Sequence, residues 1–185
     1  MHEILEELGV DAGIVYVDID PVAILHSKAI LDGNPNAIAV RGNATDIDSI
    51  LADPAVSSHL DFTRPVAVLL VAVLHFVSDE ADPIGAIRTL HKHTAPGSFL
   101  AISHASNEAN AEKIEQSSDM HRKLPTPLTF RSKAEITDLF AGFDLVEPGL
   151  VYLPLWHPDS PDDVDEHPER ANIYAGVGLR ADAAE

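Results

Sequence analysis

The stretch Pro65–Asp82, PVAVLLVAVLHFVSDEAD, constrains the fold more than any other part of the chain. It opens with eight consecutive apolar residues, Val66–Val73, without alternation of apolar and polar side chains. A strand with this pattern is typically buried on both faces, as in the middle of a parallel sheet covered by helices. Asp82 and Pro83 form a good N-cap and first-turn pair for a helix. We therefore expect a central strand that leads into a helix.

The rest of the chain alternates between apolar stretches typical of strands and stretches typical of helices. Strands are expected at 14–17, 37–40, 66–73, 98–103, 143–146, 150–155 and 173–179. Helices are expected at 2–8, 22–31, 46–51, 54–60, 84–93, 107–121 and 132–140. This alternation predicts an α/β sheet with helices on both faces, in a single domain over residues 1–185. Because no helix separates 143–146 from 150–155, these two strands are expected to form an antiparallel hairpin at one edge.

Composition excludes several classes of protein. The formal net charge of −18 argues against a nucleic-acid binder, since affinity for phosphate backbones comes from Lys and Arg. No apolar run reaches the roughly 20 residues that span a bilayer, so no membrane partner is expected. The chain has no cysteine, which removes disulfides and thiolate metal sites. We expect a cytoplasmic protein without a metal centre.

Two polar positions follow the first two expected strands. Asp18 ends a strand and precedes a helix, where a carboxylate can accept both hydroxyls of a ribose, and Ile19 would then pack on a base. The alternative is that Asp18 or Asp20 only caps the helix; two acids in three positions favour Asp20 as the cap. Asn43 follows the next strand, and its amide, with the backbone of Ala44, is suited to the edge of an adenine. As an alternative, Asn43 is an ordinary turn residue.

Two histidines end neighbouring expected strands. His75 follows the central strand and His104 follows 98–103. In open α/β sheets ligands bind outside the carboxyl ends of the strands, so the two side chains are expected to converge over one pocket. An imidazole there is suited to act as a general base, because its unperturbed pKa lies near ~6.5. The alternative is that each histidine merely caps its strand.

These motifs, taken in order, resemble one family. The segments that carry the resemblance are VYVDIDPVAILHSKAIL, RGNATD, VAVLLVAVLHFVSDEADP, APGSFLAISHAS, FRSKAEITDLFAGFDLVEPGLVYLPLW and NIYAGVGL. They are similar to bacterial S-adenosylmethionine-dependent methyltransferases once classed as a domain of unknown function, which have a class I Rossmann-like fold. The resemblance implies that Asp18 binds the ribose and Asn43 the adenine. It also implies that Ala72, Val73 and Leu74 line the cofactor site beside His75, with His104 on the next strand.

The chain departs from the family pattern at its start. The family's first strand and glycine-rich loop precede the helix with which this sequence begins, so an N-terminally truncated domain is expected. The missing strand would lie between 14–17 and 66–73, and its loss would leave backbone groups unpaired at a cost of about 1–3 kcal/mol each if buried and unsatisfied. Alternatively, 14–17 and 66–73 pair directly.

Three functions can be compared with these motifs. The resemblance implies methyl transfer from S-adenosylmethionine to an oxygen or nitrogen nucleophile of a small molecule, with His75 or His104 as base. The alternative is a non-catalytic binding or interaction fragment, with an exposed apolar sheet edge through which it would form homodimers. A nicotinamide-dependent oxidoreductase is less consistent, because no Gly-x-Gly-x-x-Gly precedes the strand that ends at Asp18.

Overall fold

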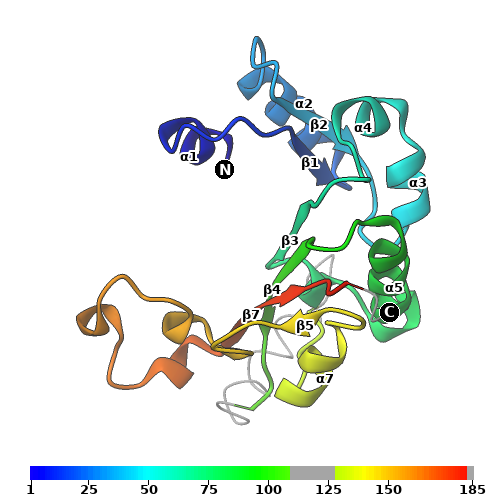
Figure 1. Ribbon diagram of the computed structural model, residues 1–185. Helices are drawn as coiled ribbons and strands as arrows, with labels where there is room; N and C mark the ends of the chain where they lie inside the picture. The colour runs from blue at the N-terminus through cyan, green and yellow to red at the C-terminus, as the bar shows by residue number, and fades with distance from the viewer. Residues whose placement is uncertain (109–127, 183–185) are drawn as a thin grey trace. The chain divides into compact units, whose positions relative to one another are not determined.

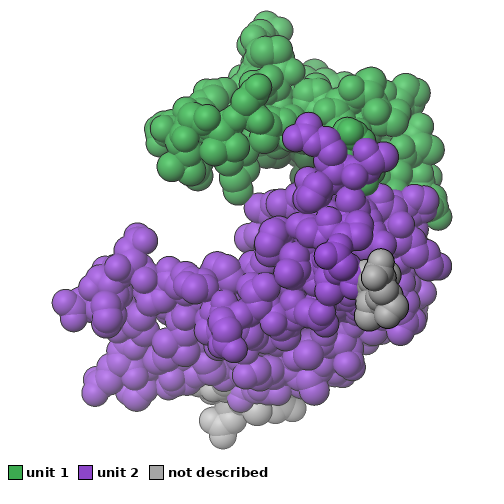
Figure 2. Space-filling model, viewed as in Figure 1, with its two compact units in different colours: residues 1–62 green, residues 63–185 purple. Residues whose placement is uncertain are grey.

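The computed structural model describes residues 1–108 and 128–182. The chain divides into two compact units, Met1–Phe62 and Thr63–Glu185 (Figure 2). The single domain expected from the sequence stays a prediction. The helix expected at 107–121 falls almost wholly outside the described residues. Among the helices that are described, none combines the length and the apolar character that a bilayer crossing requires.

The first unit contains the elements that the sequence predicts, each within one or two residues (Figure 1). They are α1 (His2–Glu7), β1 (Ile14–Asp18), α2 (Pro21–Ile30), β2 (Ala37–Arg41), α3 (Ile47–Ala52) and α4 (Pro54–His59). Asp20 caps α2 by accepting from the N–H of Val22, and Asp53 caps α4 in the same way. Each cap is followed by a proline at the first helical position, whose missing N–H needs no partner.

The sheet of the first unit consists of β1 and β2, which run parallel and in register from Ile14 opposite Ala37 to Asp18 opposite Arg41. One face of this sheet packs against α2. The buried cluster there joins residues of the helix and both strands: Ile24, Leu31, Ala37 and Ala39, with Ile14 and Tyr16 beside them. Helix α4 also contacts both strands. The parallel pairing brings the carboxyl ends of β1 and β2 to one edge.

The second unit holds the other strands and helices of the described residues. They are β3 (Ala67–Val71), η1 (Leu74–Phe76), η2 (Asp79–Ala81), α5 (Pro83–His93), β4 (Phe99–Ala105), α7 (Lys133–Asp138), β5 (Asp144–Leu145), β6 (Val151–Tyr152), η3 (Leu153–Leu155), η4 (Pro161–Asp163), η5 (Pro168–Ala171) and β7 (Ile173–Leu179). The order in the sheet is β3-β4-β7-β5, with β3 parallel and β7 antiparallel to β4. β1 and β3 thus belong to different sheets.

The core of the second unit lies around β4. Leu100 and Ile102 of this strand are fully buried, as are Ile87 of α5 and Ile136 of α7. Gly178 of β7 is required by this packing: a Cβ there would lie 2.7 Å from the Cβ of Phe143, closer than real side chains approach. The glycine therefore lets the segment after α7 close onto the sheet.

The antiparallel hairpin expected between 143–146 and 150–155 does not form: β5 and β6 each pair antiparallel with β7 and not with each other. β4 pairs along the whole of β7, so β5 and β6 both lie on the other edge of β7. Val146 still donates its N–H to the carbonyl of Val177, and pairing stops before Pro148, which has no N–H to offer. The two segments therefore behave as one strand interrupted by the Pro148–Gly149 turn.

The expectation that β3 is buried on both faces is wrong for this structure. Its residues alternate between exposed and half-buried, and Leu69 and Val71 are 45% and 55% exposed. β3 pairs with β4 along one edge, and no described strand pairs with its other edge. The uninterrupted apolar run shows that the strand is suited to a buried site. Whether it is buried depends on other segments of the chain that would have to pack against it.

Candidate functional site

The carboxyl edge of β1 and β2 carries the two polar residues singled out in the sequence. Asp18 ends β1 opposite Arg41, and Asn43 lies two residues beyond Arg41. The N–H of Gly42 donates to the carbonyl of Asp18 (3.0 Å), which holds the two strand ends together. Asp18 and Asn43 therefore lie at the same edge of one sheet, as the strand pattern predicted.

The carboxylate of Asp18 is exposed and only partly engaged. Its Oδ1 accepts the N–H of Asp20 at 2.8 Å, while Asp20 itself caps α2 through Val22 at 2.8 Å. Asp20 is therefore the cap, and Oδ2 of Asp18 accepts no hydrogen bond from the described residues. Ile19 is 60% exposed next to it, and its carbonyl accepts from Arg41 Nε (3.1 Å). This edge offers a carboxylate and an apolar side chain to an incoming ligand.

Asn43 has the geometry of an ordinary turn residue, which was the alternative to its role in adenine binding. Its Oδ1 accepts from both the N–H (3.1 Å) and the hydroxyl (3.0 Å) of Thr45. This fixes the side chain and leaves the NH₂ group as the part able to meet an acceptor on a ligand. Ala44 follows as a half-buried residue of the same turn.

In the second unit, Ala72, Val73 and Leu74 connect β3 to η1. Ala72 is exposed and has a left-handed backbone, with φ of 56°, and its N–H is held by Ser103 Oγ at 3.0 Å. Val73 is half-buried. The side chain of Leu74 is 1% exposed and belongs to the core, so this residue offers a ligand little of its own surface. The turn thus redirects the chain sharply at the carboxyl end of β3.

His75 and His104 come together as the strand order predicted. Their rings meet edge to face, with centroids 5.7 Å apart. His104 is fully buried, and its Nδ1 donates to the carbonyl of Ala105 at 2.8 Å, which leaves Nε2 as an acceptor. Burial lowers the pKa of His104 to about 4. His75 is half-buried as a residue, and its Nδ1 is itself buried and has no hydrogen-bond partner among the described residues.

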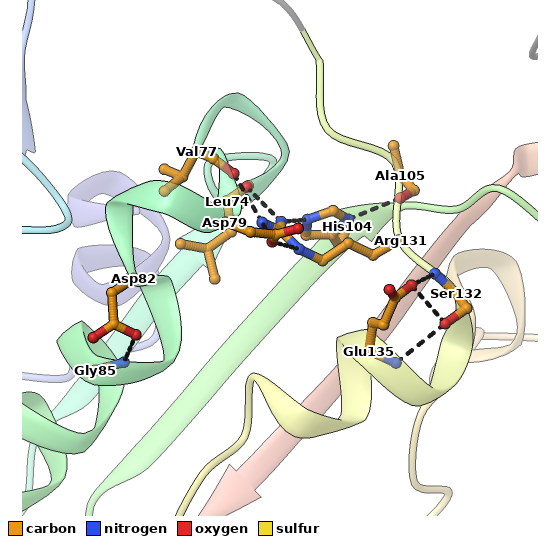
Figure 3. Close-up of polar contacts among 10 residues, drawn as sticks. All are labelled: Leu74, Val77, Asp79, Asp82, Gly85, His104, Ala105, Arg131, Ser132 and Glu135. Carbon is orange, nitrogen blue, oxygen red and sulfur yellow. Dashed lines mark hydrogen bonds and ion pairs between the residues drawn. The ribbon is translucent and has the colours of Figure 1, made fainter.

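The acceptor nitrogen of His104 is occupied by Arg131, a residue that no sequence pattern indicated. Arg131 is 3% exposed, and its Nη1 lies 2.6 Å from His104 Nε2 and donates to the carbonyl of Leu74 (Figure 3). Nη2 donates to the carbonyl of Val77 and to the carboxylate of Asp79, at 2.9 Å and 2.7 Å. Both ring nitrogens of His104 are thus engaged, and the residue has no exposed surface. The Nδ1 of His75 has no partner among the described residues, but this atom too is buried.

Arg131 was missed because its partners are remote in the sequence. The nearest partner of its side chain, His104, is 27 positions away, and Leu74 is 57 positions away. The only local signal is the capping box directly after it, in which Ser132 and Glu135 bond reciprocally at the start of α7. That signal predicts where the helix begins and says nothing about the arginine before it.

Comparison with known proteins places this arrangement in a family. Residues 1–181 match the model of a family described as S-adenosyl methyltransferase. The chain belongs to this family. S-adenosylmethionine is accordingly its cofactor and methyl transfer its general chemistry. The comparison with curated proteins gave no match.

Two solved structures support the same assignment. A Thermobifida fusca YX protein assigned as a methyltransferase is 32% identical, with a TM-score of 0.88; the alignment covers 98% of this chain and 68% of that one. A DUF574 family protein from Streptomyces avermitilis MA-4680 is also 32% identical, with a TM-score of 0.84 and coverage of 97% and 69%. Human N-acetylserotonin methyltransferase, solved in complex with S-adenosylmethionine, shares the fold at 15% identity, a TM-score of 0.59 and coverage of 98% and 44%.

Proposed function

We propose that this methyltransferase-family chain transfers the methyl group to an oxygen or nitrogen nucleophile of a small molecule, with His75 as the general base. S-adenosylmethionine, when bound, supplies an electrophilic methyl group, so the protein must position the nucleophile and take its proton. The observation that carries the proposal is the half-buried imidazole of His75, just beyond the carboxyl end of β3, whose buried Nδ1 has no hydrogen-bond partner among the described residues. Burial and the nearby charge of Arg131 lower the pKa of His75, which keeps its imidazole neutral and able to accept a proton at pH 7.

The proposed cofactor contacts in the first unit suit a nucleoside. Oδ2 of Asp18 would accept the ribose hydroxyls, and the exposed side chain of Ile19 would pack against the adenine. The NH₂ group of Asn43 and the backbone of Ala44 would meet the edge of the base. In the second unit, the proposed contacts are Ala72, Val73 and the backbone of Leu74.

The ribose contact is tested by calorimetric titration with S-adenosylhomocysteine. Asp18→Ala should weaken binding by tenfold or more, about 1.4 kcal/mol, because it removes the proposed acceptor of both hydroxyls. Asp32→Ala, an exposed carboxylate in the turn after α2, is the control and should bind like the wild type. Equal affinities of Asp18→Ala and the wild type, in variants that remain folded, would remove Asp18 from the site.

The base is tested by the release of S-adenosylhomocysteine in the presence of a panel of small phenols and amines. His75→Ala should reduce turnover about a hundredfold or more, the usual contribution of a general base, with cofactor affinity nearly unchanged. The exposed His26→Ala on α2 is the control. A loss of cofactor binding alone would make His75 part of the pocket wall. Absence of turnover by the wild type with every compound would argue against this class of acceptor.

One observation favours the interaction role as a second function. Leu69 and Val71 on β3 are large, apolar and exposed, and the strand has an unpaired edge within the described residues. Such an edge is a template for pairing with another chain. We propose a second copy of this chain as the partner.

A further inference from the structure

The segment 129–131 fastens the loop that carries His75 at three points. The carbonyl of His75 accepts the N–H of Thr129 at 2.8 Å. Arg131 binds the carbonyl of Leu74, where η1 begins, and the carbonyl of Val77, the residue directly after η1. His75 lies between these two anchored carbonyls. A single guanidinium thus spans the short helix, which its fixed, planar fork of donors makes possible.

The other contacts of Arg131 compensate its burial. A buried cation is costly unless it is paired and its donors are satisfied. Asp79 supplies the opposite charge, accepting from Nε at 3.1 Å and from Nη2 at 2.7 Å. His104 supplies a neutral acceptor, because its own proton is committed to Ala105. The arginine therefore has a partner for donors on all three of its nitrogens, and its place is fixed by β4 as well as by the loop.

We propose that Arg131 is the positioning residue of this site: by binding the carbonyls of Leu74 and Val77 it clamps η1 and fixes the orientation of the His75 ring. Its charge also acts on that imidazole. This proposal rests on His75 being the base. Arg131 is the charged group that acts on His75, and the ring of His104 on β4 meets its ring. On the loop itself, Asp79 pairs with Arg131. His104 is neutral, and Asp79 acts on His75 by offsetting the charge of Arg131.

The test follows the ring signals of His75 in the ¹⁵N-histidine-labelled chain across pH, together with amide exchange at Phe76 and Val77. Arg131→Met should raise the titration midpoint of His75 and speed exchange at both amides, since charge and clamp are lost together. Arg131→Lys should keep the midpoint near that of the wild type, because the charge stays, yet speed exchange, because one ammonium cannot reach both carbonyls and Asp79. Asp79→Asn should lower the midpoint, because the charge of Arg131 is then less offset.

Asp79→Asn decides the matter if Arg131→Met does not fold, because the Asp79 side chain is 78% exposed and asparagine keeps an acceptor for the arginine. If Arg131 only stabilises the fold, its variants should be less stable, and the titration midpoint of His75 should stay the same. An unchanged midpoint in folded Arg131→Met, or in Asp79→Asn, would overturn the proposal. These readouts need neither cofactor nor acceptor, so their failure is distinct from failure of the turnover test on His75.

Discussion

At the scale of single residues, His104 shows how burial changes what a side chain can do. It lies at the end of a strand, where a general base was expected. Its Nδ1, however, donates to the carbonyl of Ala105, and its Nε2 accepts from Arg131. His75, beyond the end of the neighbouring strand, keeps a buried Nδ1 that has no hydrogen-bond partner among the described residues. The difference comes from Arg131, which uses one histidine as an acceptor and holds the loop of the other.

The buried, neutral state of His104 predicts an acid-sensitive fold. Its pKa is lowered from 6.5 to about 4, so the unfolded chain takes up a proton there before the folded protein does. The stability this residue contributes is fully present above pH 6.5 and is lost as the pH falls from 6.5 towards 4, by on the order of 3 kcal/mol. Urea unfolding across this range measures it. His104→Asn should be less stable at pH 7 and show a shallower decline; an equal decline in both proteins would contradict the assignment.

At the scale of elements, β3 determines how the second unit meets other chains. Leu69 lies mid-strand with 45% of its surface exposed, beside an edge that no described strand covers. A charge on such an edge prevents strand pairing between copies. Leu69→Lys should therefore shift a self-associating wild type towards the monomer in light scattering, with little loss of stability.

The control for this experiment is a charge placed away from the strand edge. Ile30→Lys, at the exposed end of α2 and 74% exposed in the wild type, should leave the association unchanged. A wild type that is monomeric at all accessible concentrations would remove β3 as a self-association site.

At the scale of the whole molecule, charge is the dominant property. The chain carries 30 acidic and 12 basic residues, which gives a formal net charge of −18 at pH 7. Self-repulsion should therefore destabilise the fold at low ionic strength, and screening should relieve it. Raising NaCl from about 10 mM to about 200 mM, which shortens the screening length severalfold, should raise Tm by a few degrees. Calorimetry at constant pH checks this, and a Tm that falls with salt would show that attractive pairs dominate.

The sequence by itself determined where several helices begin and which ends of the parallel strands lie together. The strand expected at 150–155 is shorter, because β6 covers Val151–Tyr152 and η3 covers Leu153–Leu155. Asp20-Pro21, Asp53-Pro54 and Ser132 with Glu135 are local signals, and the helices they predict begin where expected. The parallel strands placed Asp18 with Asn43, and His75 with His104, because strand direction alone fixes which ends share an edge.

Only the tertiary structure decided which polar groups are paired, which strand faces are covered and which edge β5 and β6 occupy. The side chain of Arg131 meets its partners across 27 to 57 positions of sequence, and no local pattern encodes such contacts. For the same reason, the apolar run of β3 correctly predicted that the segment is a strand, but the prediction that both its faces are buried was wrong. Backbone preference is a property of neighbouring residues, whereas burial and pairing depend on what the rest of the fold brings alongside.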